Sequence, residues 1–231
     1  TDGQIFFEGE DITKARGKKM SHLRGDMQIV FQDPYASLDP RKTVSQIIAE
    51  PLIIQGKLSK TEIEQKVSRM LDTVGLAKRV ANSYPHELDG GRRQRIGIGR
   101  ALILRPKFII CDEPVSALDV SIQAQILNLL QDLQDEMNLT YIFITHDLSV
   151  VKYISHHILV MYLGQVVEKC SSRELFREKL HPYTKALLSA VPVPDIHMKK
   201  QRILLHGELT SPIDPKPGSV SKTHLTLPTN L

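Results

Sequence analysis

A short, wholly apolar segment that ends in two carboxylates limits the fold more than any other feature of this chain. Residues 108–111 form the segment, and Asp112 and Glu113 follow it directly. A strand that is apolar at every position is typical of a parallel sheet with helices on both faces. A second such strand is expected at residues 141–144, with His146 just beyond its carboxyl end. The sequence therefore predicts an α/β fold whose polar residues gather at one edge of the sheet.

The segments between the predicted strands carry helical periodicity. Apolar residues recur at helical spacing from 120 to 137 and predict a helix with one core-facing stripe. Ser59 and Glu62 have the spacing of a capping box, and Gly75 is placed to end the helix that follows. The other expected elements are strands at 4–8 and 27–31, a helix from about 91 to 105, a hairpin over 158–168 around Gly164, and helices beginning near Ser171 and His181.

The composition is that of an ordinary globular chain. Of its 231 residues, 41% are hydrophobic and 24% are charged, which is enough for one core and an appendage. The net charge of +4 is spread along the sequence, so no nucleic-acid partner is expected. Cys111 lies within an apolar strand pattern and is predicted to be a small buried hydrophobe, as in a reducing compartment. No apolar run approaches the about 20 residues that a membrane-spanning helix needs.

Two carboxylates are the expected catalytic groups. Asp112 ends a buried strand, where such a carboxylate holds Mg²⁺ through water in phosphate-loop NTPases. Glu113 is then predicted to act as general base toward an attacking water. Gln32 ends the strand at 27–31 and is placed to reach the metal or the water. A solvated strand end also explains an isolated Asp-Glu pair, but the Pro-Val-Ser-Ala-Leu-Asp that follows disfavours this simpler interpretation.

A glycine pair indicates a second contact with phosphate. Gly90 and Gly91 begin a predicted helix, where backbone N–H groups and the positive helix end attract anions. An ordinary first helical turn also explains such a pair. His146 is predicted to donate a hydrogen bond to a γ-phosphate. The phosphate-loop pattern Gly-x-x-x-x-Gly-Lys-Ser/Thr does not occur among the 231 residues, so half of a nucleotide site is predicted.

These segments together resemble the nucleotide-binding subunit of ABC transporters, from residue 1 to about residue 217. Five motifs stand in the family's order: Gln32 as the Q-loop, 88–92 as the signature, 108–113 as the Walker B strand, 116–119 as the D-loop and His146 as the switch histidine. The resemblance implies a P-loop NTPase-like ABC ATPase core, incomplete at the N-terminus. It places that domain at 1–190, its helical signature subdomain at about 41–105, and a C-terminal extension at 191–231.

The resemblance also implies the cofactors and the role of each site residue. ATP and Mg²⁺ are the expected cofactors, with Asp112 and Gln32 at the metal. Glu113, His146 and Gln32 are the expected catalytic residues. The expected nucleotide contacts are Asp89, Gly90, Gly91, Arg92, Ser116 and Asp119.

Finer motifs resemble the oligopeptide/dipeptide importer branch of the family. They lie at 31–40, 112–121, 181–184 and 207–215. In this branch two ATP-binding subunits, identical or paralogous, sandwich two ATP molecules and drive transmembrane permease subunits, with an extracytoplasmic solute-binding protein as an indirect partner. The resemblance therefore implies an ATPase that powers peptide import from the cytoplasmic face of the cell membrane.

Three departures from the family pattern shape the expectations. The family's first strand and phosphate loop precede the segment that residues 1–3 resemble, so the chain is expected to be truncated and inactive alone. Asp89 and Arg92 replace the Ser and Gln of the usual Leu-Ser-Gly-Gly-Gln signature. Residues 219–231 lack the cysteine-bearing segment that often follows in this branch, and they are interpreted as non-native sequence.

The signature departure predicts weakened hydrolysis at the site that this signature completes. Asp89 would bring a like charge toward the γ-phosphate, and two unit charges about 4 Å apart repel by about 4 kcal/mol at an effective dielectric near 20. Two alternatives soften this effect. Arg92 and Arg93 can offset part of the repulsion, or Asp89 can turn away and cap the helix.

Other functions stay open from the sequence. A non-hydrolysing partner subunit with a degenerate signature is one, and an importer ATPase for nickel or another solute is a second. A soluble ABC ATPase of DNA maintenance is a third. It is disfavoured because the sequence has no long coiled coil and carries the importer motifs at 35–40 and 181–184.

Overall fold

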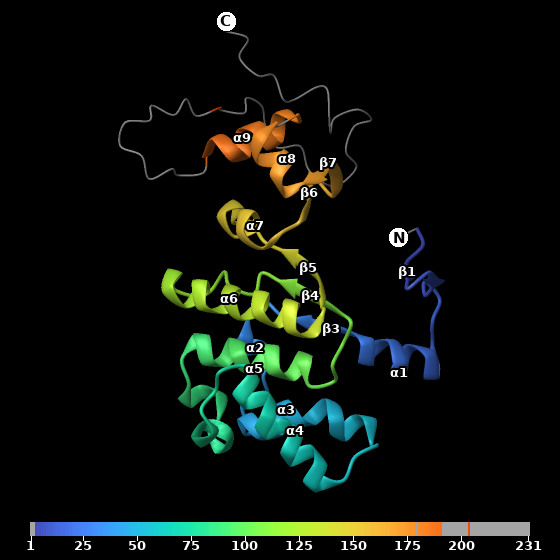
Figure 1. Ribbon diagram of the computed structural model, residues 1–231, viewed down its shortest axis with the longest axis vertical. Coiled ribbons are helices and arrows are strands. Elements are labelled where there is room, and N and C mark those ends of the chain that lie inside the picture. Colours follow the sequence, from blue (N-terminus) through green and yellow to red (C-terminus); the bar gives the residue numbers. More distant parts are fainter. Residues whose placement is uncertain (1–2, 179, 191–202, 204–231) are drawn as a thin grey trace, which may run out of the picture. The chain divides into compact units, whose positions relative to one another are not determined.

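The computed structural model describes residues 3–178, 180–190 and 203. The chain forms two compact units, Thr1–Thr145 and His146–Leu231, whose elements are labelled in Figure 1. Among the helices described, none is both long and apolar enough to cross a membrane. The predicted boundary between residues 190 and 191 adjoins residues outside the described part, and so do the motif at 207–215 and the segment 219–231. These expectations stay predictions.

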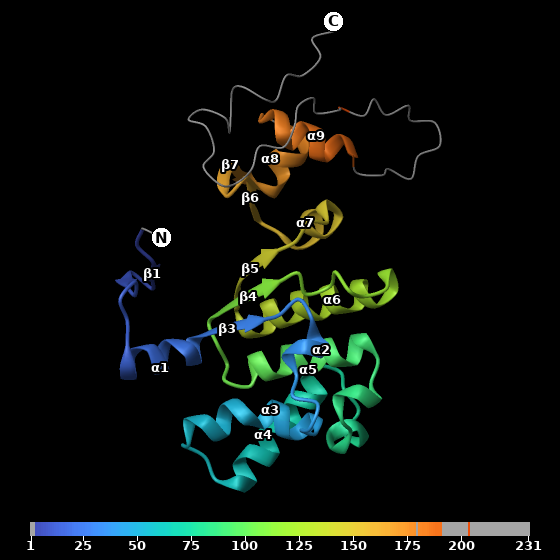
Figure 2. The ribbon, with the colours of Figure 1, turned by 180° about the vertical axis from the view of Figure 1, so that it is seen from behind.

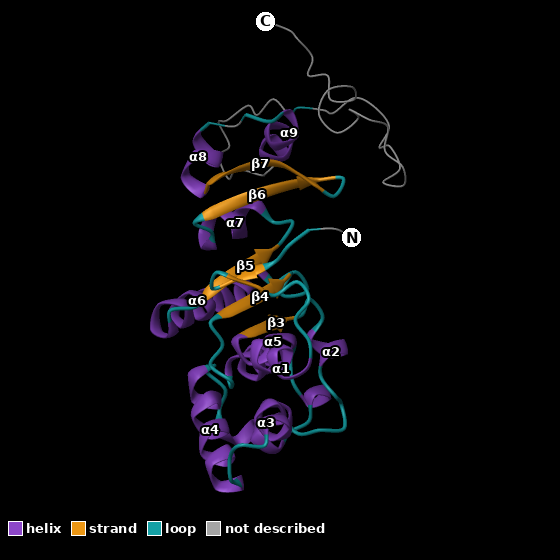
Figure 3. Cartoon of the chain, turned by 90° about the vertical axis from the view of Figure 1, so that its right-hand side faces the viewer, coloured by secondary structure: helices purple, strands orange, loops and turns teal. Residues whose placement is uncertain are grey.

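A three-stranded parallel sheet is the centre of the first unit. Its order is β3 (Met27–Val30), β4 (Phe108–Asp112) and β5 (Thr140–Ile144), as Figure 3 shows. The strands are in register, so that Val30 lies opposite Cys111 and Cys111 opposite Phe143. Because the strands are parallel, their carboxyl ends lie at one edge of the sheet, as the α/β prediction requires.

One face of this sheet is covered. Helix α6 (Val120–Met137) lies along it, in front of the strands in Figure 1 and behind them in Figure 2. The Tyr141 hydroxyl on this face donates to the carbonyl oxygen of Leu130 at 3.1 Å. Cys111 is fully buried there, and burial raises the pKa of its thiol to about 12. The prediction that Cys111 is a small buried hydrophobe is confirmed.

The opposite face is open, which corrects one expectation. Residues 141–144 were predicted to be buried on both sides, but Ile142 is 50% exposed and Ile144 is 47% exposed. Successive residues of a strand point to opposite faces, so only every second side chain of β5 reaches α6. Ile29, on the open face, lies opposite Ile110, and Ile110 lies opposite Ile142.

A helical part forms the rest of the core of the first unit. It contains α3 (Val44–Gln55), α4 (Lys60–Thr73) and α5 (Gly90–Leu102), with 3₁₀ turns η1 (Lys78–Asn82) and η2 (Pro85–Glu87) between α4 and α5. Figure 3 shows α5 between the sheet and α3. The capping box before α4 is present, and the left-handed Gly75 follows the helix end as predicted. Helix α5 begins one residue before the predicted start.

The start of the first unit differs from its prediction. The strand expected at 4–8 is reduced to β1 (Phe6–Phe7), which pairs antiparallel with β2 (Glu10–Asp11). The turn between them is tied to the main sheet, because Lys107 Nζ donates to both carboxylate oxygens of Glu8 at 2.9 and 2.8 Å. Helix α1 (Gly17–Asp26) was not predicted. It is polar and buries one residue, so it has no apolar periodicity to reveal it.

The second unit is a hairpin packed on helices. Strands β6 (His157–Tyr162) and β7 (Gln165–Ser171) pair around a Leu163-Gly164 turn with positive φ at both residues, as the predicted glycine turn requires. Its helices are α7 (Leu148–Ile154), α8 (Ser172–Arg177) and α9 (Pro182–Ala190). The buried cluster of this unit consists of Ile158, Val160, Leu175 and Leu188.

Candidate active site

Gln32 and Glu113 meet beyond the ends of two neighbouring strands. Gln32 follows β3 by two residues, and Glu113 directly follows β4. The Gln32 side-chain Nε2 donates a hydrogen bond of 2.6 Å to Glu113 Oε2. The amide therefore orients the carboxylate that the sequence assigns as general base. These two residues are 81 positions apart in the chain and are brought together by the parallel pairing of β3 with β4.

The backbone of Glu113 is held in an unusual conformation. Its φ is +42°, a region that non-glycine residues rarely occupy and that costs on the order of 1–3 kcal/mol. Three bonds fix it there. The Glu113 N–H donates to the carbonyl oxygen of Ile144 at 2.9 Å, and the Glu113 carbonyl oxygen accepts from Ser116 N–H at 3.2 Å and from Ser116 Oγ at 3.1 Å. Such enforced strain is typical of functional positions.

The oxygen donors at this strand edge fit a metal that is shared with a nucleotide. Within the described residues, no group of three or more His, Cys, Asp and Glu side chains gathers to hold an ion. Asp112, at the end of β4, and the amide oxygen of Gln32 are both hard oxygen donors. Mg²⁺ is usually held by one or two such groups together with water and substrate phosphates. The donor set therefore fits Mg²⁺ in company with a phosphate ligand.

The structure shows features of both alternatives for Asp89. This residue is the N-cap of α5, and its Oδ1 accepts from the Arg92 N–H at 2.8 Å. Its Oδ2 lies 3.3 Å from Arg92 Nε. Asp89 thus caps the helix, as one alternative expected, and its charge is paired with Arg92, as the other expected. The exposed carboxylate of Asp89 therefore already lies beside the start of α5, where an anion would bind.

The glycine pair has a packing role that sequence analysis did not find. Gly91 is buried, and a Cβ at that position would lie 2.6 Å from Ile122 Cγ2 on α6. A Cβ on Gly90 would lie 3.2 Å from Leu118 Cδ2. The pair therefore lets the start of α5 approach the start of α6 closely. No sequence signal distinguishes this requirement from an anion nest.

Gly91→Ala is expected to destabilise the chain by about 1–2 kcal/mol, because the new methyl group overlaps a β-branched side chain that cannot swing away. Gly97→Ala on the same helix is the matched control. A Cβ at Gly97 meets no atom within 4 Å, so better helix propensity should stabilise by about 0.5–1 kcal/mol. Urea unfolding of both variants measures the two changes. Equal effects of the two substitutions would contradict the packing role.

The remaining predicted contacts are at the surface. Ser116 is exposed, and its hydroxyl donates to the carbonyl oxygen of Glu113. Asp119 is exposed at the start of α6, where its side chain makes no capping bond. His146 is the exposed first residue of the second unit. The roles assigned to these residues stay predictions.

An apolar groove in the helical part was not anticipated. It lies among α3, α4 and η1 and has a volume of about 690 Å³. Its exposed surface is mainly apolar, with aliphatic residues from all three elements, and Lys60, Glu64 and Lys78 are its charged lining residues. Ile53, 60% exposed, contributes to the groove from α3. The sequence signal for this groove was weak. Periodicity assigns an apolar helical residue to the core, whether or not another element covers it.

Two family models match the chain. The ABC transporter model matches residues 1–116. The model for the C-terminal region of oligopeptide/dipeptide transporters matches residues 167–220. The resemblance that the motifs indicated is confirmed by both matches.

Relatives with established names match almost the whole chain. The oligopeptide transport ATP-binding protein OppF of Salmonella typhimurium is 55% identical over 226 residues, which are 96% of this chain and 68% of that protein. OppF of Bacillus subtilis is 58% identical over 207 residues, 88% of this chain and 67% of the relative. The oligopeptide transport ATP-binding protein AppF of Bacillus subtilis is 53% identical over 226 residues, 96% of this chain and 69% of the relative.

Solved structures share the fold. The chain matches cbiO1 of Clostridium perfringens, part of the ABC transporter complex cbiONQ, with a TM-score of 0.69 and 32% identity over 78% of this chain and 70% of that one. It also matches the ATP-binding cassette MJ0796 in a dimeric post-hydrolysis state bound to ADP and Pi, with a TM-score of 0.66 and 30% identity over 75% of each chain. The predicted α/β fold class is confirmed.

Proposed function

The chain belongs to the ABC transporter family, and on that basis we propose that it hydrolyses ATP to power the import of di- and oligopeptides. One observation carries the hydrolytic part, namely the 2.6 Å contact between Gln32 and Glu113 at the strand ends. The peptide part is supported by relatives named as oligopeptide transport proteins and by the match to the oligopeptide/dipeptide transporter region.

Glu113 is the proposed general base. Its carboxylate takes a proton from the attacking water, and Gln32 holds that carboxylate in place. Asp112 and Gln32 would hold Mg²⁺, which supplies positive charge beside the phosphates when it is bound. His146 is the proposed hydrogen-bond donor to the γ-phosphate. A positioned base of this kind accelerates proton transfer by about 10²–10⁴-fold.

A second ATP-binding subunit is the proposed partner at the nucleotide. The start of α5, with Asp89, Gly90, Gly91 and Arg92, together with Ser116 and Asp119, would face the nucleotide held mainly by that partner. The dimeric state of MJ0796 bound to ADP and Pi supports a second ATP-binding subunit as partner. A second candidate function is that of a non-hydrolysing partner subunit, which would lend its degenerate signature, with the Asp89–Arg92 pair, to the site of the other subunit.

Transmembrane permease subunits are the proposed partners in the membrane, with an extracytoplasmic solute-binding protein acting through them. The chain would then be peripheral, at the cytoplasmic face of the cell membrane. The apolar groove among α3, α4 and η1 suits an amphipathic helix of a permease, because it combines aliphatic walls with charged residues.

Ile53→Asp is expected to weaken binding of the permease subunits at least tenfold, because it places a charge in the apolar groove. Ile54→Asp is the matched control. Ile54 is the next residue of α3, is 78% exposed and does not line the groove. Co-purification of the assembled transporter measures the effect. Similar losses for both variants would mean that the groove is not the docking site.

Peptide-stimulated ATP hydrolysis by the assembled transporter in lipid vesicles tests the proposed function. Stimulation by di- or oligopeptides, with uptake of the peptide, is the expected result. Hydrolysis that depends on nickel or a sugar would replace the peptide part of the proposal. If Glu113 can be changed with no loss of total ATPase activity, the second candidate becomes the better description.

A further inference from the structure

We propose that Arg93 and Arg100 on α5 are positioning residues, which hold Gln32 against Glu113 through the short helix α2 (Pro34–Ser37). The proposal rests on the proposed function, since its effect is on ATP hydrolysis. Neither arginine contacts the site directly. Each binds a different part of the segment that begins directly after Gln32.

Helix α2 is tied by hydrogen bonds to the residue that directly follows Gln32. Asp33, the next residue, is its N-cap, and Asp33 Oδ1 accepts from the N–H groups of Tyr35 at 2.7 Å and Ala36 at 3.2 Å. The Ser37 N–H closes the turn by donating to the Asp33 carbonyl oxygen at 3.1 Å. A helix of one turn is not stable alone in water, so its place must be fixed from outside.

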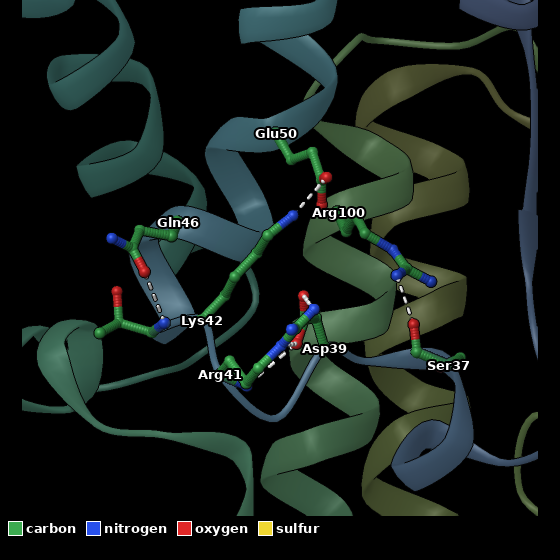
Figure 4. Close-up of polar contacts among 8 residues, drawn as sticks. Ser37, Asp39, Arg41, Lys42, Gln46, Glu50 and Arg100 are labelled. Carbon is green, nitrogen blue, oxygen red and sulfur yellow. Dashed lines mark hydrogen bonds and ion pairs between the residues drawn. The ribbon is translucent and has the colours of Figure 1, made fainter.

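Arg100 fixes the far end of α2. Its Nη1 donates to the carbonyl oxygen of Ser37 at 2.6 Å, as Figure 4 shows. The guanidinium is partly buried, and burial lowers its pKa while the Glu50 carboxylate acts in the opposite direction. Glu50 is itself held by Lys42, whose Nζ lies 2.5 Å from Glu50 Oε1. A charged donor in such a site makes a strong bond to a backbone carbonyl.

Arg93 fixes the near end of α2. Its guanidinium carbon lies 5.3 Å from the centre of the Tyr35 ring, in a cation–π contact. Its Nε donates to the carbonyl oxygens of Pro85 at 3.0 Å and Leu88 at 2.8 Å. One side chain therefore joins α2 to the segment that leads into the glycine pair.

The two arginines act from the same side of one rigid element. They are two helical turns apart on α5, so their side chains leave the same face. Helix α5 begins with Gly90 and Gly91, whose proposed ligand is the partner's nucleotide. A displacement of α5 at that nucleotide would carry α2 with it and change the distance between Gln32 and Glu113. The arginines thus couple the glycine pair to the general base.

The test is the ATPase kinetics of the assembled transporter with Arg100→Met, which keeps the length of the side chain and removes its donors. We expect kcat to fall about tenfold while KM for ATP stays within about twofold. Arg100→Lys should recover to within about threefold of the unaltered protein, because an ammonium can still donate to Ser37. Arg41→Met is the matched control. Arg41 is 87% exposed at its side chain and pairs with Asp39 in the neighbouring loop, and its loss should leave kcat unchanged.

Three results would overturn the proposal. They are unaltered kinetics of Arg100→Met, an equal effect of Arg41→Met, or a fall in thermal stability with kcat intact. If Arg100→Met does not fold, Tyr35→Leu decides, because Tyr35 is exposed and its loss removes only the contact with Arg93. We expect about a threefold lower kcat for that variant, and normal kinetics would reject the coupling. An unaltered transporter without any ATPase activity would instead reject the proposed function on which the coupling rests.

Discussion

Glu113→Gln is expected to lower ATP hydrolysis by the assembled transporter at least about 100-fold while MgATP binding remains. The amide has nearly the shape of the carboxylate but cannot accept a proton from water. The effect on MgATP binding should be small, because the expected carboxylate ligand of the metal is Asp112 and not Glu113. Single-turnover hydrolysis and equilibrium binding of MgATP measure the two properties separately.

The control for this variant is Glu178→Gln, which removes the same charge from an exposed carboxylate that pairs with Arg177 on the surface. Its hydrolysis rate should equal that of the unaltered protein. If Glu113→Gln retained more than about a tenth of the activity, the assignment of Glu113 as general base would be wrong. The strained backbone at this position would then need another explanation.

Asp89→Ser is expected to raise ATP hydrolysis about tenfold at the site that this signature completes. Serine caps a helix about as well as aspartate, so α5 should keep its start. The carboxylate beside the bound phosphate is removed, and Arg92, freed from its partner at 3.3 Å, adds attraction. The gain is smaller than the full repulsion of two isolated charges because Arg92 already offsets part of it.

Asp72→Ser is the matched control for this prediction. Asp72 is also an exposed carboxylate with a basic partner, Lys78 Nζ at 3.4 Å, but it lies on α4. Its replacement should leave the hydrolysis rate unchanged. An unchanged rate for Asp89→Ser, measured together with intact helix content, would show that the signature departure does not limit this chain.

Elements with a strong local signal were predicted well. Helix α6 has the predicted bounds, and Ile126, Leu130 and Leu133 of its stripe are buried. Helix α3 was missed for a physical reason. It is buried on several sides by α4 and α5 and contains Pro51, so its sequence has neither the periodicity nor the composition of a surface helix. Whether a face of β5 is open or covered likewise depends on which other elements pack against it, and the residues of β5 do not reveal this.

The same division applies to the site. The meeting of Gln32 with Glu113 was predictable, because parallel strands bring their carboxyl ends to one edge. The orientation of the Asp89 side chain was not predictable. The same residue at the same position can either cap the helix or point outward toward a phosphate. Arg93 was expected only to offset the charge of Asp89, and Arg100 gave no signal. An arginine on a helix is usually solvated, and only the position of α2 gives these two a positioning role.

The open face of the central sheet has a practical consequence for handling the chain. Ile29, Ile110 and Ile142 lie directly opposite one another across three strands, and Ile144 continues the apolar surface. An open aliphatic row of this kind attracts a like row from another molecule. The purified chain should therefore scatter more light as its concentration rises, and replacing Ile142 by threonine, which keeps the β-branched shape, should extend its working solubility.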